Sequence, residues 1–180
     1  MAKRVYLRSF SLADAPVILR WGKDDYYYHY AGFSRYQNLA QAELAAKQYA
    51  ARDNSYAICL QETQQVIGLV ELYERGTNDQ ELLQTKEVGF LLDKSFSGHG
   101  YMTEALQLIF AYAFNQLDQT EIWAGTFAHN LKSQKLLQRL GFKYVYFVDL
   151  SKISHLFSYQ EKYYLLDRKE WLKINANTES

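Results

Sequence analysis

Two glycines stand immediately before a predicted helix, and this arrangement favours the binding of a phosphate. Gly98 and Gly100 precede residues 103–117, where large apolar residues recur at the 3.6-residue period of a helix. The first turn of a helix presents N–H groups that have no partner within the helix, at the positive end of the helix dipole. The loop has neither the Gly-Lys-Ser/Thr of a Walker loop nor the GxGxxG of a dinucleotide site. Taken alone, it is equally well explained as a tight glycine turn.

A second group of polar residues lies about thirty positions further on, beyond another predicted strand. Asn130 is a predicted N-cap for a helix over 131–140, and Gly141 is the glycine expected after its end. Ser133 shares the predicted buried face of that helix, where a serine usually bonds the carbonyl four residues back. Lys135 belongs to a basic stripe with Lys132 and Arg139 on the same helix. Such a stripe is usually a solvated face, but beside a bound phosphate it would supply positive counter-charge.

The remaining pattern predicts a sheet with helices on its faces. Ser11 and Asp14 form a capping-box pattern, Pro16 suits the first turn that follows, and Gly22 is the expected end of that helix. Residues 24–38 are predicted as loop or irregular helix. Further helices are expected over 12–21 and 40–52, and strands over 6–10, 56–60, 66–73, 87–92, 121–126, 143–150 and 162–166. The fold class is therefore α+β (mixed α/β).

Composition narrows the class of protein. The 180 residues carry 20 Lys+Arg and 20 Asp+Glu, so the net charge is zero, which argues against nucleic-acid binding by phosphate neutralisation. Cys59 is the only cysteine and the four histidines are scattered singly, so we expect neither an intramolecular disulfide nor a metal site. The amino terminus lacks the apolar stretch of a signal peptide, and no apolar run is long enough to span a membrane. We expect a cytoplasmic protein with a single domain over residues 1–174 and a polar, frayed tail over 175–180.

The two motifs together resemble one family. Glu87 with residues 98–105, followed by residues 130–142, is similar to the GNAT superfamily of acetyl-CoA-dependent N-acetyltransferases. Within it, the ribosomal-protein N-terminal acetyltransferases and the spermidine acetyltransferases are most similar, and residues 7–15 and 163–171 also fit, so nearly the whole chain is covered. The resemblance implies a central twisted, mostly antiparallel sheet of about seven strands with a splayed parallel pair, flanked by about four helices.

Two positions depart from the family pattern. Ser97 stands where the phosphate loop of the family has Gln or Arg, and Met102 replaces a small residue. Leu137 occupies the position where many members carry a tyrosine that acts as general acid. Because backbone amides do most of the phosphate binding, the first departure weakens the match without removing the site.

The resemblance implies a set of residues that bind acetyl-CoA, which is a co-substrate here, with no metal. The backbone of Phe90, Leu91 and Leu92 would accompany the pantetheine arm. Asn130 would bond the same arm, and Lys135 is a weaker candidate for a phosphate contact. The pyrophosphate would be held by Gly98, His99, Gly100, Tyr101, Met102 and Thr103.

The implied reaction is direct attack of an amine on the thioester in a ternary complex. An alkylamine is almost fully protonated at pH 7, so a base is required. Glu87 matches a family carboxylate proposed for this role, although a structural or substrate-binding carboxylate is the alternative interpretation. A backbone N–H near Phe90 or Leu91 would stabilise the oxyanion. Because a thiolate is an undemanding leaving group, Ser133 as a hydrogen-bond donor to the sulfur would suffice without the tyrosine.

The acceptor site is expected in the segment between the first two predicted helices. Asp24, Asp25 and Tyr28 could attract and enclose a cationic amine, although packing of a lid or of a dimer contact is the commoner role of such aromatic residues. The expected acceptor is a protein N-terminus, a polyamine or another small-molecule amine, with a homodimer as a further partner and neither nucleic acid nor membrane.

Two other functions stay open. One is a GNAT-fold module that binds acyl-CoA without turnover, which the residues at Ser97 and Leu137 favour slightly. The other is a nucleotide-phosphate protein of a different fold, which competition between CoA and ATP would reveal.

Overall fold

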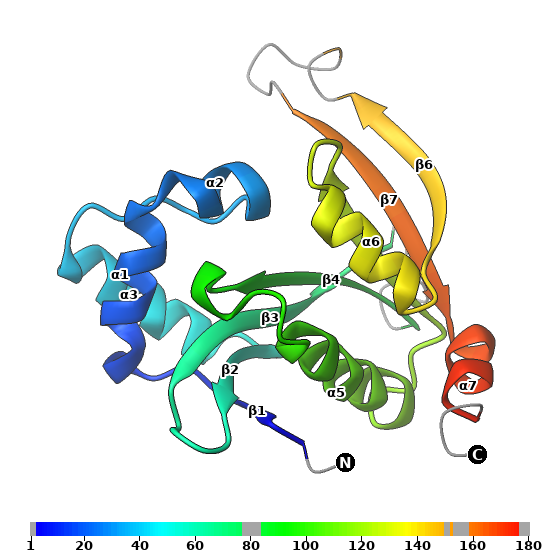
Figure 1. Cartoon of the computed structure of the whole chain (residues 1–180), viewed down its shortest axis with the longest axis horizontal. Coiled ribbons are helices and arrows are strands. Elements are labelled where there is room, and N and C mark those ends of the chain that lie inside the picture. The colour runs from blue at the N-terminus through cyan, green and yellow to red at the C-terminus, as the bar shows by residue number, and fades with distance from the viewer. Residues whose placement is uncertain (1–2, 77–83, 150–151, 153–158, 177–180) are drawn as a thin grey trace. The chain divides into compact units, whose positions relative to one another are not determined.

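The structure is a computed structural model of the whole chain, and it describes residues 3–76, 84–149, 152 and 159–176. Within those residues there are seven strands and six α-helices (Figure 1). In chain order the elements are β1 (Val5–Arg8), the 3-10 turn η1 (Leu12–Asp14), α1 (Ala15–Lys23), α2 (Asp25–Ala31), α3 (Leu39–Ala51), β2 (Ser55–Leu60), β3 (Val66–Glu74), β4 (Thr85–Leu92), η2 (Lys94–Phe96), α5 (Tyr101–Asn115), β5 (Glu121–Phe127), α6 (Leu131–Arg139), β6 (Lys143–Asp149), β7 (Gln160–Asp167) and α7 (Arg168–Ala176).

The strands form one sheet in the order β1-β2-β3-β4-β5-β7-β6. The pairs β1–β2, β2–β3, β5–β7 and β6–β7 are antiparallel, whereas β4 and β5 are parallel. The register of the parallel pair ends at Glu87↔Trp123, although β4 continues to Leu92 and β5 to Phe127. The predicted α+β fold, mostly antiparallel with one splayed parallel pair, is therefore confirmed. The structure has more helices than the four or so that the family resemblance implies.

The chain divides into two compact units. Unit 1 comprises residues 1–72 and 90–109, and unit 2 comprises residues 73–89 and 110–180. Three elements, β3, β4 and α5, therefore each contribute residues to both units. The expectation of a single domain over residues 1–174 stays a prediction.

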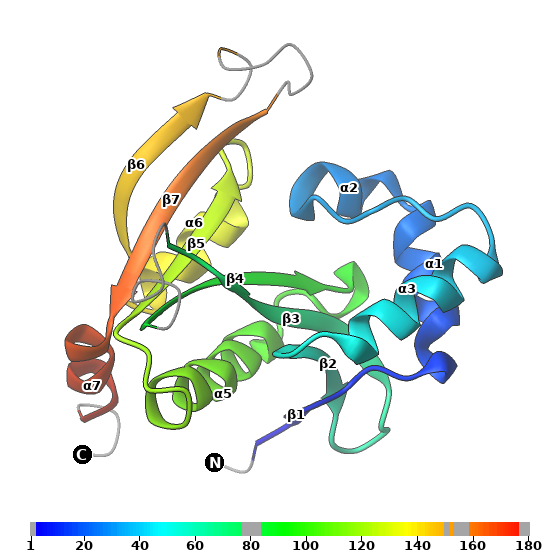
Figure 2. The same ribbon diagram turned by 180° about the vertical axis from the view of Figure 1, so that it is seen from behind.

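In unit 1 the strands are covered on both faces. Ala57 and Cys59 of β2 share a buried core with Ile18 of α1 and Ala45 of α3. Ile58 lies between those two positions of β2, so its side chain faces the opposite side of the sheet. It is also fully buried, and Figures 1 and 2 both show α5 on that side of β1, β2 and β3, with α3 on the other. The consecutive burial of these three residues thus follows from a strand between two helical layers.

In unit 2 the hairpin of β6 and β7 lies next to β5, as both views show. The last residues of α5 pack on this part of the chain, where Phe110 contacts the Phe142 ring at a centroid distance of 5.4 Å. Gly141 follows α6 with φ +93, the left-handed conformation expected of a glycine after a helix. An added Cβ there would lie 2.2 Å from the end of the Ile174 side chain in α7, so packing reinforces the choice of glycine.

Gly22 does not end the first helix as predicted. It lies inside α1, which continues to Lys23, and it is buried. A Cβ at Gly22 would lie 2.5 Å from the Tyr36 ring and 2.8 Å from the Tyr36 nitrogen. The glycine is therefore required for close approach of another segment, and its weak helix propensity is overridden by packing.

Other local predictions were right in part. Ser11 and Asp14 do form a capping box, at the 3-10 turn that leads into α1, and Pro16 lies in the first turn of α1. The segment predicted as loop or irregular helix contains the regular helix α2. The sequence pattern did not predict α7, which reaches into the expected tail; residues 177–180 of that tail lie outside the described residues.

Candidate active site

The predicted phosphate loop lies in unit 1 between η2 and α5. Gly98 and Gly100 have φ angles of +85 and +82, which glycine adopts without strain. In the part of the chain that the structure describes, no hydrogen bond uses an amide N–H between Gly98 and Thr103. The next amide, that of Glu104, donates to the Gly100 carbonyl at 3.2 Å and so begins the helical ladder. In this part of the chain, consecutive N–H groups without partners among the described residues thus run from the loop into the first turn of a helix of 15 residues.

Arg4 fixes the shape of this loop, and sequence reasoning missed it. Its Nη2 donates to the His99 carbonyl at 2.8 Å, and its Nε donates to the Glu104 carboxylate at 2.7 Å. The guanidinium also lies 4.8 Å from the centre of the Tyr101 ring. Because Arg4 and Glu104 are a hundred residues apart, no local pattern could have paired them. A loop held in this way needs little reorganisation before it binds an anion.

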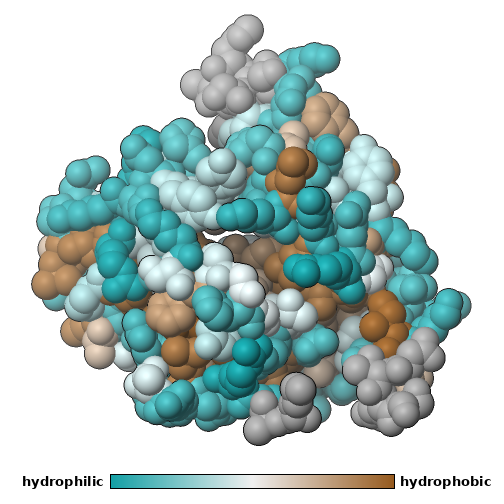
Figure 3. All heavy atoms as spheres, viewed as in Figure 1, coloured by the Kyte–Doolittle hydropathy of each residue, from teal (hydrophilic) through white to brown (hydrophobic). Residues whose placement is uncertain are grey.

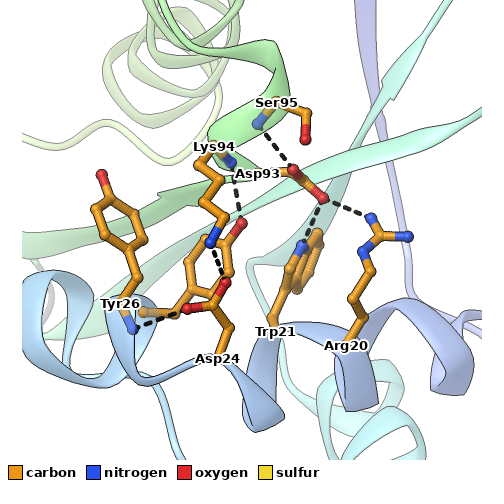
Figure 4. A network of polar contacts seen from close by, with 8 residues as sticks. Arg20, Trp21, Asp24, Tyr26, Asp93, Lys94 and Ser95 are labelled. Carbon is orange, nitrogen blue, oxygen red and sulfur yellow. Dashed lines mark hydrogen bonds and ion pairs between the residues drawn. The ribbon is translucent and has the colours of Figure 1, made fainter.

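Asp93, at the end of β4, anchors the N-terminal helices to the segment that leads into the loop (Figure 4). Its side chain is 5% exposed, and it accepts hydrogen bonds from Trp21 Nε1 at 3.1 Å and from the Ser95 amide at 3.0 Å. Arg20 adds an ion pair at 2.5 Å. Burial alone would raise the pKa of Asp93, but these donors outweigh burial and bring the pKa below its ordinary value. Asp93 is therefore a buried carboxylate stabilised as an anion.

Lys94, the neighbour of Asp93, makes the second part of the same network. Its ammonium pairs with Asp24, and its backbone N–H donates a hydrogen bond to the Tyr27 hydroxyl at 2.9 Å. Asp24 also caps α2 by accepting the Tyr26 amide at 3.0 Å. Figure 4 shows these contacts connecting α1 and α2 to η2. Asp24, predicted to bind the acceptor, therefore has two structural partners.

The other two residues predicted for the acceptor meet at a different cation. Asp25 pairs with Arg35 at 2.8 Å, and the Arg35 guanidinium lies 4.0 Å from the centre of the Tyr28 ring. Asp25 and Tyr28 thus both contact an arginine of the same chain at the surface. Tyr27 is buried in the unit 1 core, which agrees with the commoner role of aromatic residues in this segment.

Phe90, Leu91 and Leu92 form the last residues of β4, in unit 1. Leu91 is buried in the unit 1 core, and its carbonyl lies so close to Gly68 that a Cβ there would approach it to 2.5 Å. None of these three residues takes part in the register between β4 and β5. Met102, the residue that departs from the family pattern, is buried.

Glu87 lies in unit 2 on the first half of β4. Its carboxylate forms an ion pair with Arg75 and accepts a hydrogen bond from the Gly125 amide. The glycine permits this close approach, because a Cβ at position 125 would lie only 3.1 Å from Glu87 Oε1. Burial raises the pKa of Glu87, Arg75 lowers it, and the result lies above the ordinary value. A carboxylate with a raised pKa is better matched to the uptake of a proton near neutral pH.

Arg75 was missed by sequence reasoning, although it contacts the predicted base directly. Its guanidinium donates to the Tyr146 hydroxyl at 2.5 Å. It also lies 4.4 Å from the centre of the Trp123 ring and 5.0 Å from that of Tyr163. These partners come from β5, β6 and β7, so no sequence spacing relates them to Arg75. Residue 75 falls just after the strand predicted over residues 66–73, outside any motif.

The residues predicted on the second helix lie in unit 2 on α6. Asn130 is the N-cap as predicted, and its side-chain oxygen accepts the Ser133 amide at 3.1 Å. The Ser133 hydroxyl makes no hydrogen bond to any described residue, so it is not bonded to the carbonyl four residues back. Lys135 is exposed. Leu137 is fully buried, which makes this position part of the core.

Within the described residues, no cluster of three or more His, Cys, Asp or Glu side chains could hold a metal ion. Over the same part of the chain, no helix combines the length and apolar character needed to cross a membrane. Figure 3 shows apolar side chains at the surface over α1 and α3, and Leu12, Leu39 and Leu44 are the large exposed ones of η1 and α3. The predicted homodimer remains a prediction.

Comparison with known proteins agrees with the resemblance. The chain is similar to the Probable N-acetyltransferase YjcK of Bacillus subtilis, with 42% identity over 79 residues that make up 43% of this chain and 41% of that protein. The chain therefore spans less than half the length of that relative in the match. The Uncharacterized N-acetyltransferase p20 of Bacillus licheniformis is 29% identical over 148 residues, 78% of this chain and 80% of that protein.

Solved structures share the fold. An acetyltransferase (GNAT family) from Bacillus anthracis has a TM-score of 0.81 at 16% identity and covers 94% of this chain and 98% of its own. Spermidine N-acetyltransferase from Vibrio cholerae, solved in complex with CoA and spermine, has a TM-score of 0.77 at 16% identity over 95% of this chain and 99% of its own. The model of the acetyltransferase (GNAT) domain family matches residues 4–143. The chain therefore belongs to the GNAT family of acetyltransferases.

Proposed function

We propose that this chain is an acetyl-CoA-dependent N-acetyltransferase that acetylates a primary amine by direct attack in a ternary complex. The observation that carries the proposal is the row of amides from Gly98 to Thr103 that have no partner among the residues that the structure describes. A row of N–H groups at the start of a long helix is suited to a diphosphate, because each donor faces an anion without competition from the protein. Arg4 supports this role by holding the loop through the His99 carbonyl.

The proposed base is Glu87. Burial raises the pKa of Glu87. Partial burial of the acceptor would destabilise its ammonium form and lower the pKa of the amine, so the two pKa values would lie closer together. The ammonium gives one proton to Glu87, and the nitrogen lone pair forms the C–N bond to the thioester carbon. The C–S bond then breaks, and the thiolate takes the second proton from nitrogen. An oxyanion formed on the way would be stabilised by a main-chain N–H near Phe90 or Leu91.

The remaining assignments follow the family resemblance. The backbone of Phe90, Leu91 and Leu92 would accompany the pantetheine arm. The Ser133 hydroxyl supports a role as donor to the departing sulfur, since no hydrogen bond to a described residue competes for it. Asn130 caps α6 with its oxygen, and by the family resemblance it would also bond the pantetheine arm. The exposed ammonium of Lys135 is available to a phosphate.

A matched pair of variants tests the phosphate loop. A Cβ at Gly98 would meet no atom within 4 Å, and Asn and Asp are the residues that best tolerate positive φ. Gly98→Asn and Gly98→Asp therefore share the same backbone strain and differ by one negative charge. A carboxylate about 6 Å from a phosphate charge raises the energy of the complex by roughly 1–3 kcal/mol after screening, a weakening of about 10- to 100-fold.

Calorimetric titration with acetyl-CoA measures this difference, and mass spectrometry over a panel of amines measures the reaction. The panel includes peptide N-termini, aminoglycosides, amino acids and polyamines, the last because the Vibrio cholerae neighbour was solved with spermine. We expect acetylated product with the parent chain and Gly98→Asn, and reduced product with Gly98→Asp at low acetyl-CoA. Equal affinity of the two variants would contradict the assignment of the loop.

The ion pair between Arg75 and Glu87 favours one alternative, an acyl-CoA-binding module without turnover. A carboxylate that stays paired with a guanidinium accepts a proton less readily. In that case acetyl-CoA would bind tightly, no amine of the panel would be acetylated, and Glu87→Gln would leave the chain unchanged in both assays.

A further inference from the structure

Unit 2 contains an aromatic cage that encloses a cation. The Arg75 guanidinium lies over the Trp123 and Tyr163 rings and donates to the Tyr146 hydroxyl. The rings also contact one another, since Tyr146 and Tyr163 stack at a centroid distance of 4.8 Å and Trp123 lies 6.0 Å from Tyr146. The electron-rich faces of such rings attract cations, and most strongly where water is partly excluded. The Arg75 side chain is only 24% exposed.

The cage carries more negative charge than Arg75 neutralises. Glu87 pairs with Arg75, whereas Glu161 accepts a hydrogen bond from the Tyr163 hydroxyl at 2.8 Å. No cation of the described residues forms an ion pair with Glu161. Two carboxylates and one guanidinium therefore leave a net charge of −1 at the cage. This excess favours a second cation, or a cation that replaces Arg75.

The strands explain why these groups converge. Glu87 and Trp123 are partners in the register of the parallel pair, so they lie side by side on β4 and β5. Tyr163 is opposite Gly125 on β7, and Tyr146 is opposite Tyr163 on β6. The neighbouring residue Tyr164 points to the other face, where its hydroxyl meets α6. The cage thus belongs to the face of these strands that α6 does not cover.

We propose that this cage, formed by Trp123, Tyr146, Tyr163, Glu87 and Glu161, is a binding site for the primary alkylammonium group of the acceptor, and that Arg75 is its intramolecular occupant when no acceptor is bound. The proposal deepens the proposed function, on which it rests. An acceptor ammonium that replaces Arg75 would lie against Glu87, which the proposed reaction requires as base.

The contacts define the class of acceptor. Arg75 enters the cage as a flat cation at the end of an unbranched chain of methylene groups, and an aminoalkyl group has the same slender form. An ammonium offers three N–H donors to the two carboxylates and the Tyr146 hydroxyl. A neutral alcohol of the same size keeps the apolar contacts but loses the charge. A branched amine would overlap the rings, and an amine that also carries an acidic group would be repelled by the two carboxylates.

Arg75→Ala empties the cage and gives the main test. Calorimetric titration of this variant with n-butylammonium and methylguanidinium, without acetyl-CoA, should show binding about tenfold or more tighter than to the parent chain, while n-butanol should not bind. Adding Trp123→Leu or Glu161→Gln to Arg75→Ala should remove most of this gain. Adding Glu62→Gln, which removes the same charge from an exposed turn after β2, should leave it intact. If Arg75→Ala binds butylammonium no better than the parent chain, the proposal is wrong.

A second measurement uses the parent chain and does not depend on that variant. The Nε–H resonance of Arg75 should shift on addition of butylammonium and stay in place on addition of butanol. An unchanged resonance at the highest butylammonium concentration would overturn the role of Arg75 as a displaceable occupant. Both experiments measure cation binding alone, without acetyl-CoA or turnover. If the cation binds but no amine of the panel is acetylated, the cage proposal stands and the proposed function is rejected. Acetylation that is unaffected by Trp123→Leu and Glu161→Gln would reject the cage alone.

Discussion

Asp93→Asn should strongly destabilise the chain, because it changes one atom of a buried carboxylate that three donors share. Asn can keep the hydrogen bond from the Ser95 amide, but its NH2 group then faces Trp21 Nε1 and the Arg20 guanidinium (Figure 4). The Trp21 side chain is 1% exposed, so its indole N–H would stay buried without an acceptor. An unsatisfied buried donor costs about 1–3 kcal/mol, and the loss of a charge-assisted partner adds roughly 1 kcal/mol.

We therefore expect the free energy of unfolding to fall by about 2–4 kcal/mol, which corresponds to a drop of roughly 1–2 M in the urea midpoint. Urea titration followed by tryptophan fluorescence measures this change. Arg20→Gln is the matched control: the Arg20 side chain is 57% exposed, so its loss should cost less than about 1 kcal/mol. A loss within about 0.5 kcal/mol for Asp93→Asn would refute the claim that this carboxylate anchors the N-terminal helices.

Three further predictions concern helix packing and pH. Gly22→Ala should destabilise the chain by roughly 1–3 kcal/mol in thermal unfolding, although alanine favours helices, because its methyl group would overlap Tyr36; a stabilised variant would contradict this packing. Arg75→Met should move the acid limb of the kcat/KM profile to higher pH, because Arg75 lowers the pKa of Glu87; an unmoved limb would argue against Glu87 as base. The pKa of Asp14 lies below its ordinary value, because its hydrogen bonds outweigh burial, so the stability that it contributes is present at neutral pH. That stability should be lost as the pH falls through the folded-state pKa, below the ordinary aspartate range, and Asp14→Asn should flatten this part of a urea stability profile.

Local signals in the sequence were sufficient for most of the fold. The seven strands and the helices around the two motifs follow from apolar periodicity, and caps such as Asn130 and Gly141 were read correctly because the residues that form them are adjacent in sequence. The role of Gly22 was predicted wrongly because it depends on close packing against Tyr36, and no local sequence pattern indicates this contact. The segment of α2 was predicted only as loop or irregular helix for a related reason, since its aromatic residues are poor indicators of a regular helix.

The candidate site divides in the same way. The loop at Gly98 could be located from the sequence, because two glycines stand before an apolar helix, but a role in phosphate binding was suggested only by the two motifs together. Arg4 and Arg75 could not, because each acts through partners in distant elements. The sequence places Asp25 and Tyr28 together on one helix, but it does not reveal that Arg35 of the same chain already contacts both.

Binding of acetyl-CoA fragments tests the role of the loop amides most directly. Acetyl-dephospho-CoA keeps the diphosphate, whereas S-acetylpantetheine has no phosphate at all. Calorimetry should show that acetyl-dephospho-CoA binds almost as tightly as acetyl-CoA and that S-acetylpantetheine binds at least about 100-fold more weakly, a difference of roughly 3 kcal/mol. Gly98→Asp should remove most of that difference and Gly98→Asn should keep it. Equal binding of the three ligands by the parent chain would contradict the account.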